Sequence, residues 1–148
     1  MVWEIIMNIL EQFKTAREVY LGMVNQHSDA IIKEIIKDLG IRYPGLTCGT
    51  IVGYTPGFND GEPCEHWSNI EVLDMNEEAL GQVLDSLDIE ESDFESNNLT
   101  SEEARAIETE LGLVDDILEE KEGTNYQFAF VIIDGTITFK TGYYDCGY

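Results

Sequence analysis

The sequence predicts an α+β fold, in which amphipathic helices pack on a small antiparallel sheet. Apolar residues recur at helical spacing through most of the first 40 residues, and another helical pattern begins at Thr100. Near the C-terminus, two runs of β-branched and aromatic residues flank Asp134 and Gly135, a pair typical of type I′ hairpin turns. With 148 residues, 43% of them hydrophobic, the chain is expected to form one domain over residues 1–148.

The first 40 residues are expected to form two helices. Ser28 or Asp29 is expected to cap the second helix, and Gly40 suits the C′ position at its end. His27 lies at the break between the helices and is interpreted as a surface or capping residue. The apolar face of the first helix consists of Trp3, Ile6, Leu10, Phe13, Val19, Tyr20 and Met23, and that of the second of Ile31, Ile32, Ile35, Ile36 and Leu39.

Two strands joined by a long loop are expected next. Residues 46–54 form a short β-branched run bounded by turn residues, and residues 67–72 alternate in the manner of an edge strand. Within the loop, residues 59–61 are expected to form an Asx-type turn. Phe58 and Trp67 are expected to fill the core.

The remaining elements are two helices, an acidic linker and the hairpin. Asn76 is expected to cap a short acidic helix, and Thr100 with Glu103 has the capping-box spacing of a longer one. Residues 88–99 lack periodicity and predict a solvated acidic linker that is able to move. The hairpin is expected to join residues 46–54 in one antiparallel sheet, with helices covering one face.

Negative charge dominates the composition. The chain has 30 acidic and 8 basic residues, a net charge of −22, and residues 71–123 alone hold 19 acidic and 2 basic residues. This balance disfavours direct binding to nucleic acid or to an anionic membrane, because both need Lys and Arg. A basic protein is the natural partner. No apolar run reaches the length of a membrane span, no signal peptide is evident, and the odd number of three cysteines favours a reducing cytoplasm.

The acidic third predicts a partner-binding surface. Carboxylates on a helix rise about 1.5 Å per residue, which approximates the spacing of about 1.7 Å per charge along duplex DNA. The leading hypothesis is a binding protein that inhibits or modulates a basic, nucleic-acid-binding host or defence protein by DNA mimicry. The alternative is a face that only keeps the protein soluble. The predicted partner-binding residues are Glu102, Glu103, Glu110, Asp115, Asp116, Glu119 and Glu120.

A second hypothesis is a zinc protein or a small enzyme. Four soft ligands are available for a Cys₃His zinc site: Cys48, Cys64, His66 and Cys146. Cys64, His66 and Asp60 also have the residue types of a thiol nucleophile, its base and an orienting carboxylate. The alternative interpretation is buried thiols and a structural turn. The chain contains no phosphate-binding glycine loop, GxSxG, HExxH or EF-hand pattern, so no enzyme activity and no cofactor other than zinc is predicted.

The loop also carries a resemblance. Tyr54-Thr55-Pro56-x-Phe58-Asn59-Asp60-Gly61-x-x-Cys64 resembles a signature of small uncharacterised phage and bacterial proteins. The resemblance implies a phage or mobile-element origin and the host cytoplasm as location, and it implies no catalytic residue. A third hypothesis follows, a phage structural or assembly protein in which the long N-terminal helix mediates self-association, although Ala16 interrupts the apolar face of that helix.

Overall fold

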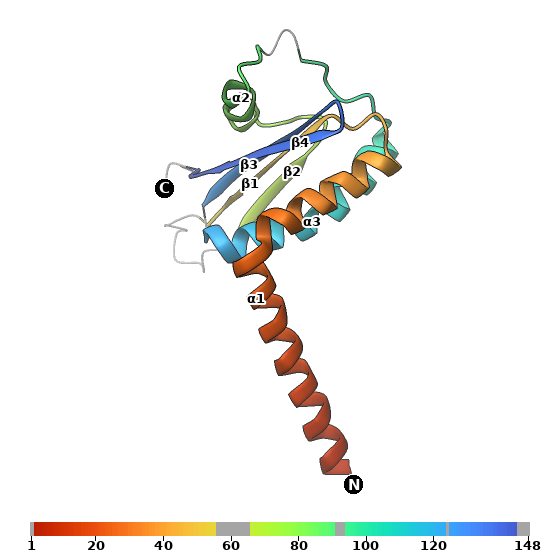
Figure 1. The fold of residues 1–148 in the computed structure, drawn as a ribbon, viewed down its shortest axis with the longest axis vertical. Helices are drawn as coiled ribbons and strands as arrows, with labels where there is room; N and C mark the ends of the chain where they lie inside the picture. The colour runs from red at the N-terminus through yellow and green to blue at the C-terminus, as the bar shows by residue number, and fades with distance from the viewer. Residues whose placement is uncertain (1, 56–65, 91–93, 124, 145–148) are drawn as a thin grey trace, which may run out of the picture.

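A computed structural model describes residues 2–55, 66–90, 94–123 and 125–144, with the side chains of the first helix described from residue 8 onward. Three helices and four strands form an α+β fold, as predicted (Figure 1). In chain order they are α1 (Val2–Arg42), β1 (Cys48–Tyr54), β2 (Trp67–Glu71), α2 (Glu77–Ser86), α3 (Ser101–Glu122), β3 (Tyr126–Ile133) and β4 (Thr136–Gly142).

The four strands form one antiparallel sheet in the order β2-β1-β3-β4. The predicted hairpin is confirmed: β3 and β4 pair directly, and both turn residues, Asp134 and Gly135, have positive φ, as a type I′ turn requires. β3 also pairs with β1, and β2 lies at the edge of the sheet, as expected.

Helices cover both faces of the sheet. Tyr126, Phe128 and Phe130 belong to the apolar cluster formed with α1 and α3, whereas Ala129 and Val131, on alternate positions of β3, pack with α2. Figure 1 shows α2 on one side of the sheet and α1 with α3 on the other. The expectation that helices cover only one face was wrong. β3 has apolar residues at both its odd and its even positions, so both faces of the sheet need to be covered.

Two glycines of β1 make room for the aromatic residues of β3. Gly49 pairs with Phe130 and Gly53 with Tyr126. A Cβ added at Gly49 would lie 2.6 Å from the Phe130 ring, and one at Gly53 would overlap the Tyr126 ring. The absence of a side chain at each glycine therefore lets both rings approach the backbone of β1 closely.

α1 has two halves in different surroundings. Every residue from 8 to 20 is exposed, whereas Val24, Ile32 and Ile36 are buried. Figure 1 shows the first half projecting from the body and the second half packing beside α3. The predicted break is confirmed, because His27 has non-helical backbone angles (φ −131°, ψ 17°).

Two sequence expectations near the sheet were wrong. Gly40 does not end a helix, since α1 continues to Arg42, and its missing side chain instead accommodates Ile132, whose Cδ1 would lie 3.1 Å from an added Cβ. Trp67 does not fill the core, because 56% of its surface is exposed on the edge strand. Phe58 lies outside the described residues.

The helix caps follow the sequence. Asn76 Oδ1 accepts a hydrogen bond of 2.9 Å from the Ala79 amide at the start of α2. Thr100 and Glu103 form the predicted capping box of α3, with hydrogen bonds of 3.1 and 3.0 Å. None of the helices that the structure describes combines the length and apolar character of a membrane span.

Candidate functional site

The predicted carboxylates of α3 point in three directions, because α3 buries one face that includes Ile107 and Leu111. Towards α1, Glu103 completes the capping box and Glu110 Oε1 lies 2.7 Å from Arg42 Nη2. The hydrogen bonds that Arg42 donates to Glu110 and to Asp38 raise the pKa of Arg42 above its usual range. The fold itself therefore uses Glu103 and Glu110.

A second group of carboxylates faces β2 and the start of β3. Asp115 accepts a hydrogen bond of 2.5 Å from the Tyr126 hydroxyl. Burial, followed by this hydrogen bond, raises the pKa of Tyr126 above its usual value. Glu119 Oε2 lies 4.0 Å from His66 Nε2. Asp115 thus holds a buried tyrosine, and only Glu119 of this group is well exposed.

A third group faces solvent, but it does not form a continuous acidic row. At 100° per residue, Glu102, Asp116 and Glu120 share the outward ridge of α3. The residues between them on the same ridge are Arg105, Thr109 and Leu113. About 21 Å of helix separates Glu102 from Asp116 at a rise of 1.5 Å per residue. The ridge therefore lacks the regular charge spacing of duplex DNA.

Three of these carboxylates gather at the end of α3, where α1 leaves the body. Asp116, Glu119 and Glu120 line a hollow of about 450 Å³ with Tyr20 and Gly123. Partial burial, and then the charges of Asp116 and Glu120, raise the pKa of Tyr20. The neighbouring Lys121 lies away from the hollow and donates to Ser28 (2.9 Å) and Asp29 (3.4 Å).

Acidic residues also lie on other surfaces. Burial and the charges of Glu108 and Asp74 raise the pKa of Glu71 on β2. Glu77 and Glu78 occupy the first turn of α2, on the opposite side of the sheet. The acidic third of the chain thus spreads its charge over both faces of the molecule.

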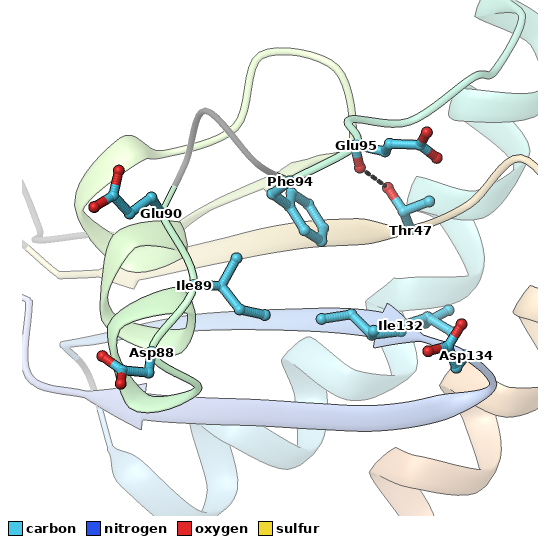
Figure 2. A pocket seen from close by; sticks show the side chains of 9 residues that line it. Thr47, Asp88, Ile89, Glu90, Phe94, Glu95, Ile132 and Asp134 are labelled. Atoms are coloured by element: carbon cyan, nitrogen blue, oxygen red, sulfur yellow. Dashed lines mark hydrogen bonds between the residues drawn. The ribbon is translucent and has the colours of Figure 1, made fainter.

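A groove beside α2 combines acidic and apolar side chains. It has a volume of about 680 Å³ and lies between the segment after α2 and the β3-β4 turn. Ile89 and Phe94 lie on one side of it (Figure 2) and pack with Ile133 of β3 in the apolar cluster on the α2 side of the sheet. The acidic lining residues are Asp88, Glu90, Glu95 and Asp134. We call this site the acidic groove.

The segment that forms one wall of the acidic groove is anchored to the sheet. Asn97 Oδ1 accepts from the amides of Thr47 (2.6 Å) and Cys48 (3.0 Å), and its Nδ2 donates to the carbonyls of Cys48 (2.8 Å) and Val72 (2.6 Å). The Thr47 hydroxyl donates to the Glu95 carbonyl at 2.9 Å (Figure 2). The second half of the expected linker is therefore fixed in place.

The proposed zinc ligands do not come together in the described part of the chain. Cys48 begins β1, whereas His66 precedes β2 and lies beside the far end of β1, where Thr55 Oγ1 is 3.0 Å from its Nδ1. Six residues of strand separate these ends by about 20 Å, so Cys48 and His66 cannot bind one ion. No group of three potential metal ligands occurs among the described residues. Cys64, Cys146 and Asp60 lie outside them.

The contacts of Cys48 and His66 indicate structural roles for both residues. Cys48 is fully buried, its Sγ lies 3.3 Å from Met75 Sδ, and burial raises the pKa of its thiol. Ser68 Oγ and the Tyr126 hydroxyl lie 3.3 and 3.4 Å from His66 Nε2. Together with Thr55, these contacts fix the imidazole ring at the end of the sheet.

Sequence reasoning did not identify the acidic groove or Asn97. The acidic groove joins residues from three separate parts of the chain, and no periodicity connects them. An asparagine inside an acidic, aperiodic stretch carries no signal that its side chain is half-buried. The only sequence signal was the pair Ile89 and Phe94, two large apolar residues in a segment otherwise rich in acids.

Comparisons with known proteins found no matching family model, no matching curated protein and no matching solved structure. The resemblance of residues 54–64 to a phage and bacterial signature stays a prediction, and most of that segment lies outside the described residues. Function must therefore be inferred from the geometry and charge of the residues themselves.

Proposed function

We propose that the protein binds a basic segment of another protein in the acidic groove. The observation that carries this proposal is the combination of four carboxylates with an apolar floor in a groove of about 680 Å³. Ligand-binding clefts are commonly of this size and combine apolar lining with a few oriented polar groups. A segment with Lys or Arg beside aliphatic or aromatic residues fits both features.

The groove and the overall charge have different roles in this proposal. The apolar contacts of Ile89, Phe94 and Ile133 supply affinity that salt does not screen. The net charge of −22 draws a basic partner towards the molecule and speeds association. Glu102, Asp116, Glu119 and Glu120 contribute to this field from α3.

The partner class is a basic, nucleic-acid-binding host or defence protein, which the acidic protein inhibits or modulates by occupying its cationic surface. A phage-type origin belongs to the same proposal and rests on the signature of residues 54–64. The interrupted ridge of α3 favours local docking in the acidic groove over imitation of a whole duplex.

A binding assay with an arginine-rich peptide that also contains leucine tests the proposal. Glu90→Gln/Glu95→Gln removes two charges from the acidic groove, and Glu119→Gln/Glu120→Gln removes two from α3 as a matched control. At about 0.2–1 kcal/mol for each of the two exposed charge pairs, the groove variant is expected to bind about 2- to 30-fold more weakly. Wild-type affinity should also fall as salt rises from about 50 to 200 mM.

Two results would contradict the proposal. If both double variants lose affinity equally, docking in the acidic groove is wrong and only general charge attraction remains. If the peptide does not bind the wild-type protein at low salt, the basic-partner function is wrong.

A further inference from the structure

The projecting half of α1 presents apolar side chains that the rest of the described structure leaves exposed, except at Tyr20, which lies beside the end of α3. We call residues 8–23 the N-terminal arm. Its large apolar side chains are between 43% and 65% exposed: Ile9, Leu10, Phe13, Val19, Tyr20 and Met23. Scattered exposed apolar residues are normal on proteins, but a continuous patch marks an interaction site.

The spacing of these residues matches a helix-pairing seam. Ile9, Phe13, Ala16, Tyr20 and Met23 are separated by four, three, four and three residues. This alternation is the a/d pattern of a coiled coil, in which the seam faces another helix of the same period. Glu11, Lys14 and Glu18 fall on the opposite side of the arm.

The arm also lacks support within its own chain. Residues 8–19 are all exposed, so tertiary packing does not hold this part of the helix, and only Tyr20 beyond it lies beside α3. Most helical stability in proteins comes from packing of an amphipathic face. An arm that contains β-branched residues and Gly22 therefore requires a partner surface for stability.

We infer that the N-terminal arm pairs with the arm of a second copy of this chain, and that the two arms run antiparallel. Six side chains at these exposures present on the order of 500 Å² of apolar surface per copy, taking roughly 150–200 Å² for a large side chain. Two copies together reach about 1,000 Å², the area from which specific interfaces begin, when the pairing covers Leu10 and Val19 on the two flanks as well as the seam.

Side-chain volume favours the antiparallel orientation. In a parallel in-register pair, Phe13 would face Phe13 of the partner, and Ala16 would face Ala16 of the partner. A layer of two large side chains would then lie next to a layer of two small ones. In an antiparallel pair, a positions face d positions, so a small Ala16 can lie opposite a large residue such as Phe13. The alanine that interrupts the apolar face thus becomes part of the fit.

Charge favours the same orientation. The arm has two acidic and two basic residues and is neutral, whereas residues 24–148 hold 27 acidic and 6 basic residues, a net charge of −21. Parallel pairing would bring two such bodies side by side. Antiparallel pairing places the two bodies about 25 Å apart along the helix axis. This separation is twice the distance from the centre of the arm to Val24, where the body begins, at a rise of 1.5 Å per residue. The separation is about three Debye lengths at physiological ionic strength.

Sedimentation equilibrium of the full chain tests this inference. The wild type is expected to form a dimer with twice the 16.7 kDa mass of one chain. Phe13→Glu places a charge in the seam and is expected to weaken dimerisation at least 100-fold. Thr15→Glu adds the same charge on the outward face of the same helix and is expected to leave the dimer unchanged. Melting of each variant checks that the body is folded.

Small-angle scattering of the wild type decides the orientation. An antiparallel dimer is expected to give two lobes whose centres lie on the order of 50–60 Å apart, from the arm length and a body radius of about 15 Å. Adjacent lobes would overturn the antiparallel orientation. A monomer at all concentrations up to about 100 μM, or equal effects of Phe13→Glu and Thr15→Glu, would overturn the pairing itself.

The result is independent of the proposed function. Higher salt is expected to preserve or strengthen the dimer, because it screens repulsion between acidic bodies, whereas it weakens docking of a basic peptide. Phe13→Glu is expected to leave peptide binding in the acidic groove unchanged.

Discussion

The side chain of Asn97 joins the acidic segment to the sheet through four hydrogen bonds. Its amide oxygen accepts from two consecutive backbone amides at the start of β1, and its amide nitrogen donates to the carbonyls of Cys48 and Val72. These bonds hold three separate parts of the chain together, so removal of the side chain is expected to cost stability.

Asn97→Ala is expected to lower the free energy of unfolding by about 3 kcal/mol. Each buried hydrogen bond contributes about 1 kcal/mol net, and because Asn97 is only half-buried we expect water to replace about one of the four. For a chain of this size, each kcal/mol lowers the melting temperature by about 2–4 °C, so the expected decrease is about 6–12 °C. Urea denaturation and calorimetry measure the two quantities.

Asn98→Ala is the matched control. Asn98 is exposed, and its structural role is a backbone hydrogen bond of 2.9 Å from its amide to the Gly45 carbonyl, which alanine preserves. This variant is expected to stay within about 0.5 kcal/mol of the wild type. If the Asn97 and Asn98 variants differ by less than about 1 kcal/mol, the four hydrogen bonds do not anchor the segment.

Three further predictions concern titratable groups. The raised pKa of Tyr126 means that the unfolded chain ionises first, so stability should fall as pH rises above about 10, and Tyr126→Phe should lack this extra loss in denaturant titrations. Glu71→Gln should stabilise the protein at pH 7, because the raised pKa of Glu71 means that the folded state disfavours its charge. The gain should vanish below about pH 4, where wild-type Glu71 is protonated. An equal gain at both pH values would contradict this prediction. Cys48 should resist iodoacetamide at pH 8 in the native protein and react after unfolding, as peptide mass spectrometry can show; rapid native labelling would mean that its thiol is accessible.

Local sequence chemistry was sufficient for much of the fold. The positive-φ turn at Asp134 and Gly135, the capping box at Thr100 and the helix break at His27 were all predicted, because each depends on a few neighbouring residues. The pairing of β1 with the hairpin followed from the marginal stability of an isolated hairpin.

The tertiary structure alone decided which predicted surfaces are available. Carboxylates that look equivalent in the sequence differ because Glu110 meets Arg42 and Asp115 meets Tyr126, partners that are 68 and 11 residues away. The periodicity of apolar residues in α1 predicts a buried face along the whole helix, yet only the second half of α1 packs against the body. Periodicity specifies which side of an element is apolar, but the packing of distant elements determines whether that side is buried, which is why the sequence could not separate core from contact surface.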